Sequence, residues 1–362
     1  DGSLVASTAC TGALLSNTTG SIIGAYGGSG AHHYNFSGLI DEVEVWNTAL
    51  SEQEIQENMY LSLSGYEDGL VGYWSFDDGE GETLTDLTPN GNHGTINGAT
   101  WSDDFPLLPH TGPEWYVSEG GSNDNNGSAN YPFATIQKAI NSANENDSIF
   151  VGSGTYFENI NFNGKGVGLV SLDGPESTVI DGNQNGTVVT FNSGETDAAR
   201  LNGFMVANGS ANQGGGIHIS GGSSPLIKNC DIVDNSGSWG GGIFSQDASP
   251  TIMHCYIANN ISDNQNSSGG GIYLSRSNAV IGHCEIINNS ATLFGGGIAI
   301  EECQSPEIFE TVLSGGSAGN GAGIYVSTGS DPFIHGCQII NNSSSWDGGG
   351  FKFTSSSGTI EH

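Results

Sequence analysis

Basic residues are scarce in this 362-residue sequence. It contains six Lys and Arg residues against 39 Asp and Glu residues, which gives a formal net charge of −33 at pH 7. Nucleic acids and anionic membrane surfaces both require clustered positive charge on the proteins that bind them. The composition therefore argues against both as partners. It indicates a soluble protein, and cation binding is the more specific alternative.

Long apolar runs are also missing. No stretch approaches the ~18 consecutive apolar residues of a membrane span, so membrane insertion is not expected. Glycine contributes 58 residues, and this abundance predicts an all-β protein with many tight turns. The chain begins without Met inside a predicted strand and ends within a repeat. We therefore expect a fragment of a longer protein, with any signal sequences outside it.

Residues 1–108 contain aromatic strand segments and one short helix signal. Ser51 and Glu54 have the spacing of a capping box, which predicts a helix start. The phrases FSGLIDEVEVWNTALSEQEI and LVGYWSFDDGEG, followed by DLTPNGNHGTINGATW, resemble the LamG-like, concanavalin A-like jelly roll of secreted bacterial proteins. The resemblance covers the C-terminal part of such a domain, so we expect a partial β-sandwich.

The jelly-roll resemblance also implies a metal ion. Domains of this type often bind Ca²⁺, and carboxylates with loop carbonyls suit that ion. The candidate ligands in the polar loop region are Asp77, Asp78, Asp86 and Asn90. The alternative interpretation is a solvated acidic loop.

A segment with two prolines, PHTGP at residues 109–113, reads as a linker to a second domain at residues 114–362. Soon after it, Ile136, Ala139, Ile140 and Ala143 share one face of a predicted helix. We expect this short helix to cap the open end of a β-stack.

The second domain is repetitive. A triplet of small residues, GGG in five cases and GAG in one, ends at Gly216, Gly242, Gly271, Gly297, Gly323 and Gly350. The intervals are 26, 29, 26, 26 and 27 residues, and a short strand pattern follows each triplet. Repeats of this length built from strands alone predict a β-helix with coils stacked ~4.8 Å apart.

The opening YVS…GS…PFATIQKAI…V…GTYFENI and these repeats resemble the right-handed parallel β-helix, or pectin-lyase-like, family over residues 116–362. The fold that we expect is therefore all-β. It consists of a right-handed parallel β-helix with an N-terminal helical cap and a truncated C-terminal end, preceded by the partial jelly roll. The family contains both enzymes and non-enzymes, so the fold alone does not assign an activity.

The glycine triplets and the cysteines read as structural. A phosphate loop would contain Lys or open onto a helix, whereas each triplet runs into a strand and lacks Lys. One repeat position holds Cys230, Cys255, Cys284 and Cys337, with Thr311 in the fourth slot. We expect a ladder of buried thiols along the axis, because zinc ligands would have to converge on one point. Cys10 and Cys303 lie off this ladder.

Two polar positions also recur. His254 and His283 directly precede ladder cysteines, at a predicted bend where polar side chains stack. A catalytic Cys–His pair is disfavoured there, because adjacent residues of a strand face opposite ways. The asparagines expected to form a ladder in the stacked turns are Asn235, Asn260, Asn289 and Asn342.

One row of residues is the candidate binding surface. The second residue after each triplet should point outward, and it is aromatic or imidazole in four repeats: His218, Phe244, Tyr273 and Tyr325. Such rings could form an exposed ridge that stacks on sugar rings. The alternative is an aromatic stack that only shields the sheet.

We interpret the chain as a secreted or cell-surface protein that binds an extracellular polysaccharide or cell-surface glycan, or mediates adhesion, and is a monomer. The rival function is a polysaccharide lyase or glycoside hydrolase, and a third alternative is a structural stalk. Outward candidates for catalysis, such as Lys228, Asp231, Glu285 and Glu301, do not pair on adjacent coils. No catalytic residue is therefore assigned, and no cofactor other than Ca²⁺ is expected.

Overall fold

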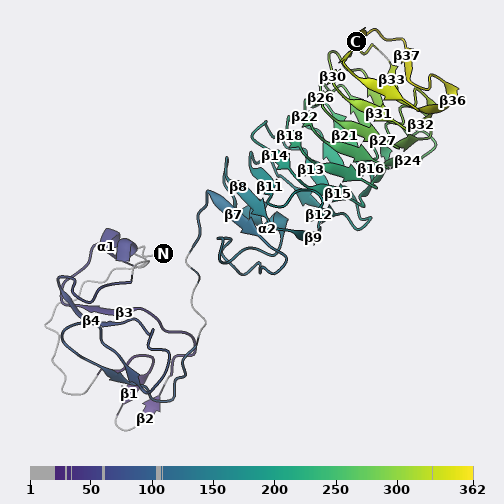
Figure 1. Ribbon diagram of the computed structural model, residues 1–362. Coiled ribbons are helices and arrows are strands. Elements are labelled where there is room, and N and C mark those ends of the chain that lie inside the picture. Colours follow the sequence, from purple (N-terminus) through teal and green to yellow (C-terminus); the bar gives the residue numbers. More distant parts are fainter. Residues whose placement is uncertain are drawn as a thin grey trace. The chain divides into compact units, whose positions relative to one another are not determined.

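The computed structural model describes residues 21–28, 31–33, 35–58, 62–102, 107, 109–327 and 329–361. The chain divides into two compact units, residues 1–108 and 109–362 (Figure 1). Within the described residues, no helix has the length and apolarity needed to cross a bilayer.

In its described residues, the first unit contains short antiparallel strand pairs and one helix. The pairs are β1 (Tyr26–Gly28) with β2 (Ala31–His33), β3 (Val43–Trp46) with β4 (Leu70–Trp74), and β5 (Thr83–Leu84) with β6 (Gly94–Thr95). Helix α1 (Glu52–Asn58) starts at the predicted capping box. The Glu54 amide donates to Ser51 Oγ at 3.2 Å, and the Ser51 amide donates to Glu54 Oε2 at 2.7 Å. The predicted helix start is confirmed.

The second unit is a parallel β-helix with four sheets running along its axis. Sheet 1 has ten strands: β7 (Glu114–Val117), β8 (Ser148–Val151), β11 (Gly168–Ser171), β14 (Arg200–Asn202), β18 (Leu226–Lys228), β22 (Thr251–Met253), β26 (Val280–Gly282), β30 (Glu307–Phe309), β34 (Phe333–His335) and β38 (Thr359–Glu361). Sheet 2 has eight: β9 (Gly154–Phe157), β12 (Thr178–Asp181), β15 (Met205–Ala207), β19 (Asp231–Val233), β23 (Tyr256–Ala258), β27 (Glu285–Ile287), β31 (Val312–Ser314) and β35 (Gln338–Ile340).

The other two sheets lie on either side of the glycine triplets. Sheet 3 has six strands: β16 (Ser210–Gln213), β20 (Ser236–Trp239), β24 (Ile261–Ser262), β28 (Ser290–Ala291), β32 (Ser317–Asn320) and β36 (Ser343–Asp347). Sheet 4 has eight: β10 (Ile160–Asn161), β13 (Val189–Phe191), β17 (Ile217–Ile219), β21 (Ile243–Gln246), β25 (Ile272–Ser275), β29 (Ile298–Glu301), β33 (Ile324–Ser327) and β37 (Phe351–Thr354). A typical coil runs through sheets 1, 2 and 3, crosses the triplet and enters sheet 4.

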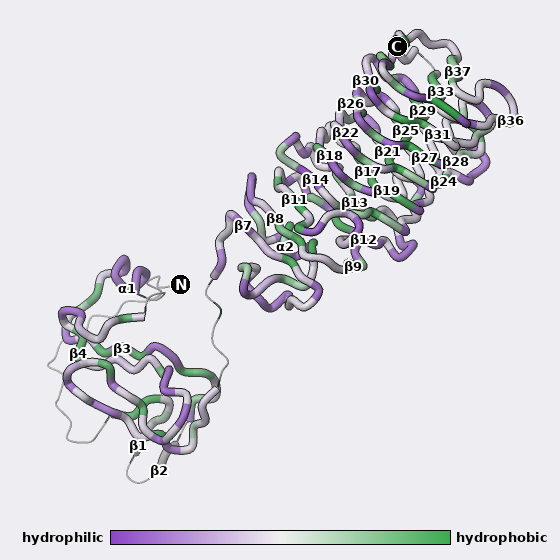
Figure 2. The backbone as a smooth tube through the Cα atoms, in the orientation of Figure 1, coloured by the Kyte–Doolittle hydropathy of each residue, from purple (hydrophilic) through white to green (hydrophobic). Residues whose placement is uncertain are grey.

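The core of the β-helix is a continuous column of apolar side chains. Ile227, Ile252, Ile281 and Ile308 lie opposite one another in sheet 1 and are fully buried. Figure 2 shows hydrophobic segments recurring from coil to coil along the strands. The repeat therefore stacks one apolar residue on its equivalent in the next coil, as the sequence predicted.

Helix α2 (Ile136–Ser142) lies beside β7 and β8, at the first coils (Figure 1). The Thr135 side chain caps it by accepting from the Lys138 amide at 3.3 Å. The side chains expected to share a face, including Ile136, Ala139 and Ile140, are buried in the same core as the coils. The predicted amphipathic helix is confirmed by this packing.

The bend between sheets 1 and 2 carries the predicted thiol and imidazole rows. Cys230, Cys255 and Cys284 are buried free thiols, and Thr311 follows them at the same position. The rings of His254 and His283 stack with centroids 4.9 Å apart and planes 6° from parallel. The ladder of thiols is confirmed, whereas Cys10 lies outside the described residues.

Glycine begins each triplet because the backbone is left-handed there. Gly240 has φ +64°, and a Cβ on it would lie 2.1 Å from the carbonyl oxygen of Ile243. Five other triplets begin with a glycine of φ between +54° and +70°. The triplets are therefore turns, as the sequence predicted.

The asparagine ladder satisfies the backbone at the turn between sheets 2 and 3. Asn235 Nδ2 donates to Asn260 Oδ1 at 3.0 Å, and Asn260 Nδ2 donates to Asn289 Oδ1 at 3.0 Å. The amide of Asn260 also reaches the carbonyl of Ile232 at 2.8 Å. The ladder is interrupted at Gly316 and resumes at Asn342, which accepts from the Gly316 amide at 2.8 Å.

Candidate functional site

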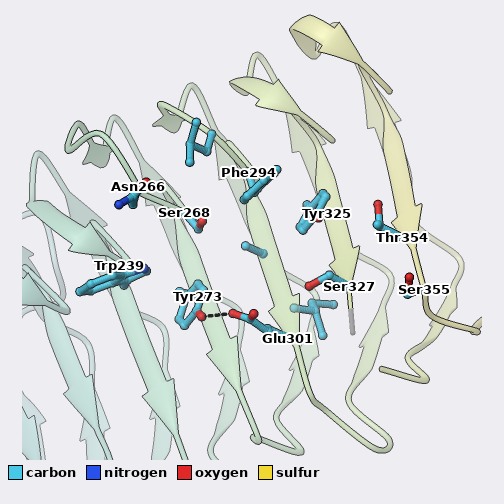
Figure 3. A pocket seen from close by; sticks show the side chains of 13 residues that line it. Trp239, Asn266, Ser268, Tyr273, Phe294, Glu301, Tyr325, Ser327, Thr354 and Ser355 are labelled. Atoms are coloured by element: carbon cyan, nitrogen blue, oxygen red, sulfur yellow. Dashed lines mark hydrogen bonds between the residues drawn. The ribbon is translucent and has the colours of Figure 1, made fainter. Parts of the chain in front are cut away.

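The bend at the glycine triplets encloses a cavity of about 380 Å³ on the outside of the coils. Its walls come from Trp239 of sheet 3, from strands of sheet 4, and from the segments that connect β24 and β28 to their triplets (Figure 3). The lining combines aromatic rings, hydroxyl groups and one carboxylate. This mixture of flat apolar surfaces and a few polar groups is typical of a small-molecule or glycan site.

The residues that directly precede the triplets form the first part of the lining. Trp239, Ser268 and Phe294 occupy equivalent positions on three successive coils and form backbone bridges to one another. Trp239 is 37% exposed, so a large part of its indole remains open to solvent. The left-handed glycine that follows each of these residues turns the chain, so that their side chains lie beside those of sheet 4.

Sheet 4 contributes a row of outward-facing side chains in which one small residue lies between two aromatic residues. Tyr273, Ala299 and Tyr325 lie opposite one another on β25, β29 and β33. Because Ala299 has no ring, a gap separates the two tyrosines, which lie two strand spacings or ~9.6 Å apart along the axis. Phe294 lies over Tyr325 on one side of this gap, with centroids 4.3 Å apart. Tyr273 and Tyr325 therefore line the cavity on either side of Ala299, which is itself 2% exposed.

The polar edge of the cavity is a second row on sheet 4. Glu301, Ser327 and Thr354 are in register on β29, β33 and β37. The Tyr273 hydroxyl donates a hydrogen bond to Glu301 Oε2 (Figure 3). Burial, together with this contact and the charge of Glu301, raises the pKa of Tyr273 well above its ordinary value. The tyrosine thus remains a neutral donor that orients the carboxylate.

The loop that precedes the third triplet contributes the remaining polar groups. This repeat has the longest interval, 29 residues between Gly242 and Gly271, and the extra residues form a turn between Ser262 and Ser268. Ser267 Oγ donates to the carbonyl of Ser262 at 2.5 Å, which closes the turn. Asn266 and Ser268 then line the cavity.

The four residues predicted for sugar binding do not form a single exposed ridge. The rings of His218, Phe244 and Tyr273 stack in sequence, with centroids 5.2 Å and 5.6 Å apart. The expected exposure is wrong for Phe244, which is 2% exposed, and for Tyr273, which is 9% exposed. The physical reason is that stacked neighbours cover each other's faces.

The structure separates these four residues into two pairs. Tyr273 and Tyr325 line the cavity, whereas the stack that includes His218 and Phe244 continues away from it. His218 bonds Ser220 Oγ at 3.0 Å through Nε2, and burial lowers the pKa of His218. The contact of any of the four residues with a sugar stays a prediction.

Sequence reasoning missed Trp239 and Phe294 as site residues. Both are aromatic residues immediately before a triplet, visible as WGGG and FGGG in the sequence. Their repeated position before a triplet is the signal that could have found them, because equivalent positions of successive coils lie side by side. Glu301 was recognised as an outward carboxylate, but its proximity to Tyr273 was not.

The predicted calcium ligands lie in the first unit. Asp86 is buried, and its oxygens accept from the amides of Tyr73, Thr88 and Asn92 and from the Thr88 hydroxyl, at 2.7–3.1 Å. Burial alone would raise the pKa of Asp86, but these hydrogen bonds hold it below the ordinary value. Four donors fill the lone pairs of the carboxylate, so Asp86 does not fit as a metal ligand.

The other three predicted ligands differ from Asp86 in their surroundings. Asp77, Asp78 and Asn90 are exposed. Asp78 accepts from the Thr85 amide at 2.9 Å, and Asn90 Nδ2 donates to the carbonyl of Val71 at 3.1 Å. Among the described residues, no three His, Cys, Asp or Glu side chains converge as a metal site would require. Calcium binding by this loop stays a prediction.

Comparisons with known proteins bear on both units. A family model described as "Concanavalin A-like lectin/glucanases superfamily" matches residues 1–56. A second, described as "Right handed beta helix region", matches residues 125–319 and 261–362. A search of curated proteins gave no match.

Several solved structures are similar to the chain. Carrot pectin methylesterase is 17% identical over 69% of this chain and 90% of its own, with a TM-score of 0.39. Pectin methylesterase PemA from Erwinia chrysanthemi is 14% identical over 64% and 90%, with a TM-score of 0.34. Pectate lyase Pel9A is 17% identical over 70% and 78%, with a TM-score of 0.34.

The β-helix match spans the stacked coils and more than half of the chain. The chain therefore belongs to the right-handed parallel β-helix family.

Proposed function

We propose that this protein binds an extracellular polysaccharide in the cavity at the bend between sheets 3 and 4. The observation that carries the proposal is the lining itself, in which Trp239, Phe294 and Tyr325 surround a space edged by Glu301. Binding of this kind would serve attachment to a glycan surface, and the proposal includes a location outside the cell.

Each part of the lining has a partner on a sugar ring. Aromatic rings present large flat apolar surfaces that can pack against the C–H face of a pyranose. The Glu301 carboxylate can accept hydrogen bonds from sugar hydroxyls, and bonds to a charged acceptor are stronger than neutral ones. Ser327, Thr354 and Asn266 add neutral donors and acceptors at the edge of the cavity. A few polar groups in an apolar site fix the orientation of a ligand.

The stacked coils also suit a polymer. Successive strands repeat every ~4.8 Å, so equivalent side chains form rows along the axis. One such row in sheet 4 holds Glu301, Ser327 and Thr354, and it continues the polar edge of the cavity from coil to coil. A polysaccharide chain lying along this row would meet one polar side chain on each coil, first the Glu301 carboxylate and then the hydroxyls of Ser327 and Thr354.

Cleavage of the bound chain is the rival activity. A glycoside hydrolase usually needs two carboxyl groups about 5–9.5 Å apart. Of the described residues that line the cavity, Glu301 is the only one that carries a carboxylate. This lining therefore supports binding better than hydrolysis, and cleavage by a polysaccharide lyase is the alternative that the experiment below tests.

The proposal is tested by affinity electrophoresis and calorimetry against a panel of polysaccharides. We expect at least one polysaccharide to bind the wild-type protein, and Trp239→Ala to weaken that binding about tenfold or more. The matched control is Tyr256→Ala, which removes an aromatic residue of the same 37% exposure from sheet 2, outside the cavity.

Three results would overturn the proposal. One is the absence of binding across the panel, and another is equal weakening by both variants. The third is the appearance of reducing ends or unsaturated products during incubation, which would assign an enzyme instead.

A further inference from the structure

The charges around the cavity indicate whether it binds neutral or acidic polysaccharides. This inference rests on the proposed function. Glu301 places a carboxylate at the cavity edge, and it is held there by the hydroxyl of Tyr273. No Lys or Arg is present among the described residues of the lining. A negatively charged sugar bound there would therefore meet a like charge without a compensating cation.

The two basic residues on nearby strands are already paired. Lys352 lies opposite Tyr325 in sheet 4, and its Nζ donates to Asp347 Oδ2 at 2.9 Å. Arg276 follows β25, and it donates to both oxygens of Asp247 at 2.7 Å and 2.9 Å and to Glu302 at 3.2 Å. Neither side chain offers a free positive charge to an acidic ligand.

The remaining four basic residues lie in other parts of the β-helix. Lys138 is in α2, with its Nζ 5.4 Å from the ring centroid of Phe133. Lys165 donates to three carbonyls at the end of the same helix. Arg200 and Lys228 are in β14 and β18 of sheet 1, which does not line the cavity. All six basic residues of the sequence are thereby accounted for.

We infer that the cavity selects neutral polysaccharides and rejects polyuronates. Like charges within a partly desolvated site repel strongly, because the effective dielectric constant is far below that of water. The net charge of −33 adds a longer-range repulsion of polyanions. A neutral sugar avoids both effects and still donates hydroxyl hydrogens to Glu301.

The experiment uses pairs of polymers that share a backbone and differ in charge. A neutral glucan is compared with its C6-oxidised glucuronan, and methyl-esterified polygalacturonate with its de-esterified form. Calorimetry is run on the wild-type protein and on Glu301→Gln. The matched control is Glu285→Gln, which removes the same charge from β27 of sheet 2.

The wild-type protein should bind the neutral polymer of a pair at least about tenfold more tightly than the charged polymer. Glu301→Gln should reduce this ratio of affinities several-fold. Glu285→Gln should leave the ratio unchanged. Added salt should narrow the ratio in the wild-type protein, because salt screens the repulsion.

Tighter binding of the charged member, or a ratio that Glu301→Gln does not change, would overturn this inference while the proposed function stands. Absence of binding to every polymer would overturn the proposed function and this inference with it.

Discussion

The ring of Phe294 lies nearly parallel to the ring of Tyr325, at 19°, although Phe294 lies between β28 and its triplet and Tyr325 lies on β33 of the next coil. Phe294 ends the chain segment before one triplet, and Tyr325 follows the next triplet. The contact shows that the bend at the triplets brings the side chains of its two flanking segments together. The cavity lies in the same bend, beside this pair.

Replacing Asn260 by Ala should destabilise the β-helix strongly. Asn260 Oδ1 accepts from the Asn235 amide at 3.0 Å, and its Nδ2 donates to the carbonyl of Ile232. Removal leaves buried backbone groups without partners, which costs about 2–4 kcal/mol of unfolding free energy. Asn342→Ala is the graded control, because Asn342 is only partly buried. Urea unfolding should show a clearly smaller loss for Asn342→Ala, and equal losses would contradict the ladder's role.

Alanine substitutions at two glycines distinguish the cost of backbone strain from the cost of a steric clash. Gly240 and Gly222 both have positive φ, +64° and +78°. A Cβ at position 222 meets nothing within 4 Å, whereas one at position 240 meets the carbonyl of Ile243. Gly222→Ala should therefore cost about 1 kcal/mol, and Gly240→Ala about 2 kcal/mol more. Thermal unfolding of both variants tests this ranking, and the reverse order would disprove it.

Glu195 should make stability depend on pH in the acid range. Its buried carboxylate accepts from Ser223 Oγ at 2.6 Å and from the amides of Gly164 and Ser193. Burial alone would raise its pKa, but these bonds lower the pKa below the ordinary value. The unfolded state therefore binds more protons in this range. The stabilisation is present above the unfolded pKa of about 4.3 and is lost as the pH falls through the lower folded pKa.

Unfolding in urea at neutral pH and at pH about 3.5 measures this effect. Glu195→Gln should lose about 1–3 kcal/mol at neutral pH and show a smaller difference between the two pH values than the wild-type protein. Glu285→Gln, at an exposed position, controls for the change in net charge. An unchanged pH dependence in Glu195→Gln would count against the role of the Glu195 carboxylate.

Much of the β-helix could be predicted from sequence because its signals repeat. The triplet glycines, the cysteine row and the asparagine row each recur at one position per coil. A residue type that recurs at the same position of each repeat can be assigned a structural role without knowledge of its side-chain contacts. The break at Gly316 in the asparagine row could be read in the same way, since glycine has no side chain to continue the ladder.

The cavity was harder to predict, because it depends on what each ring contacts. The outward direction of Phe244 follows from strand alternation, but its 2% exposure arises from rings on adjacent coils. Likewise, the meeting of Phe294 with Tyr325 depends on the angle of the bend, which the spacing of residues does not give. The interruption at Ala299 was visible, but its consequence required the geometry of both sheets.

If the cavity lined by Trp239, Phe294 and Tyr325 binds a sugar, a bulky side chain at the lining position Ala299 should block it. Ala299→Phe should place a ring between Tyr273 and Tyr325, whereas Ala299→Gly leaves the space open as a matched control. Calorimetry with the tightest-binding neutral polysaccharide should show at least about a tenfold loss of affinity for Ala299→Phe and near wild-type affinity for Ala299→Gly. Thermal unfolding checks that both variants are folded. Unchanged binding by a folded Ala299→Phe variant would mean that the sugar does not occupy this cavity.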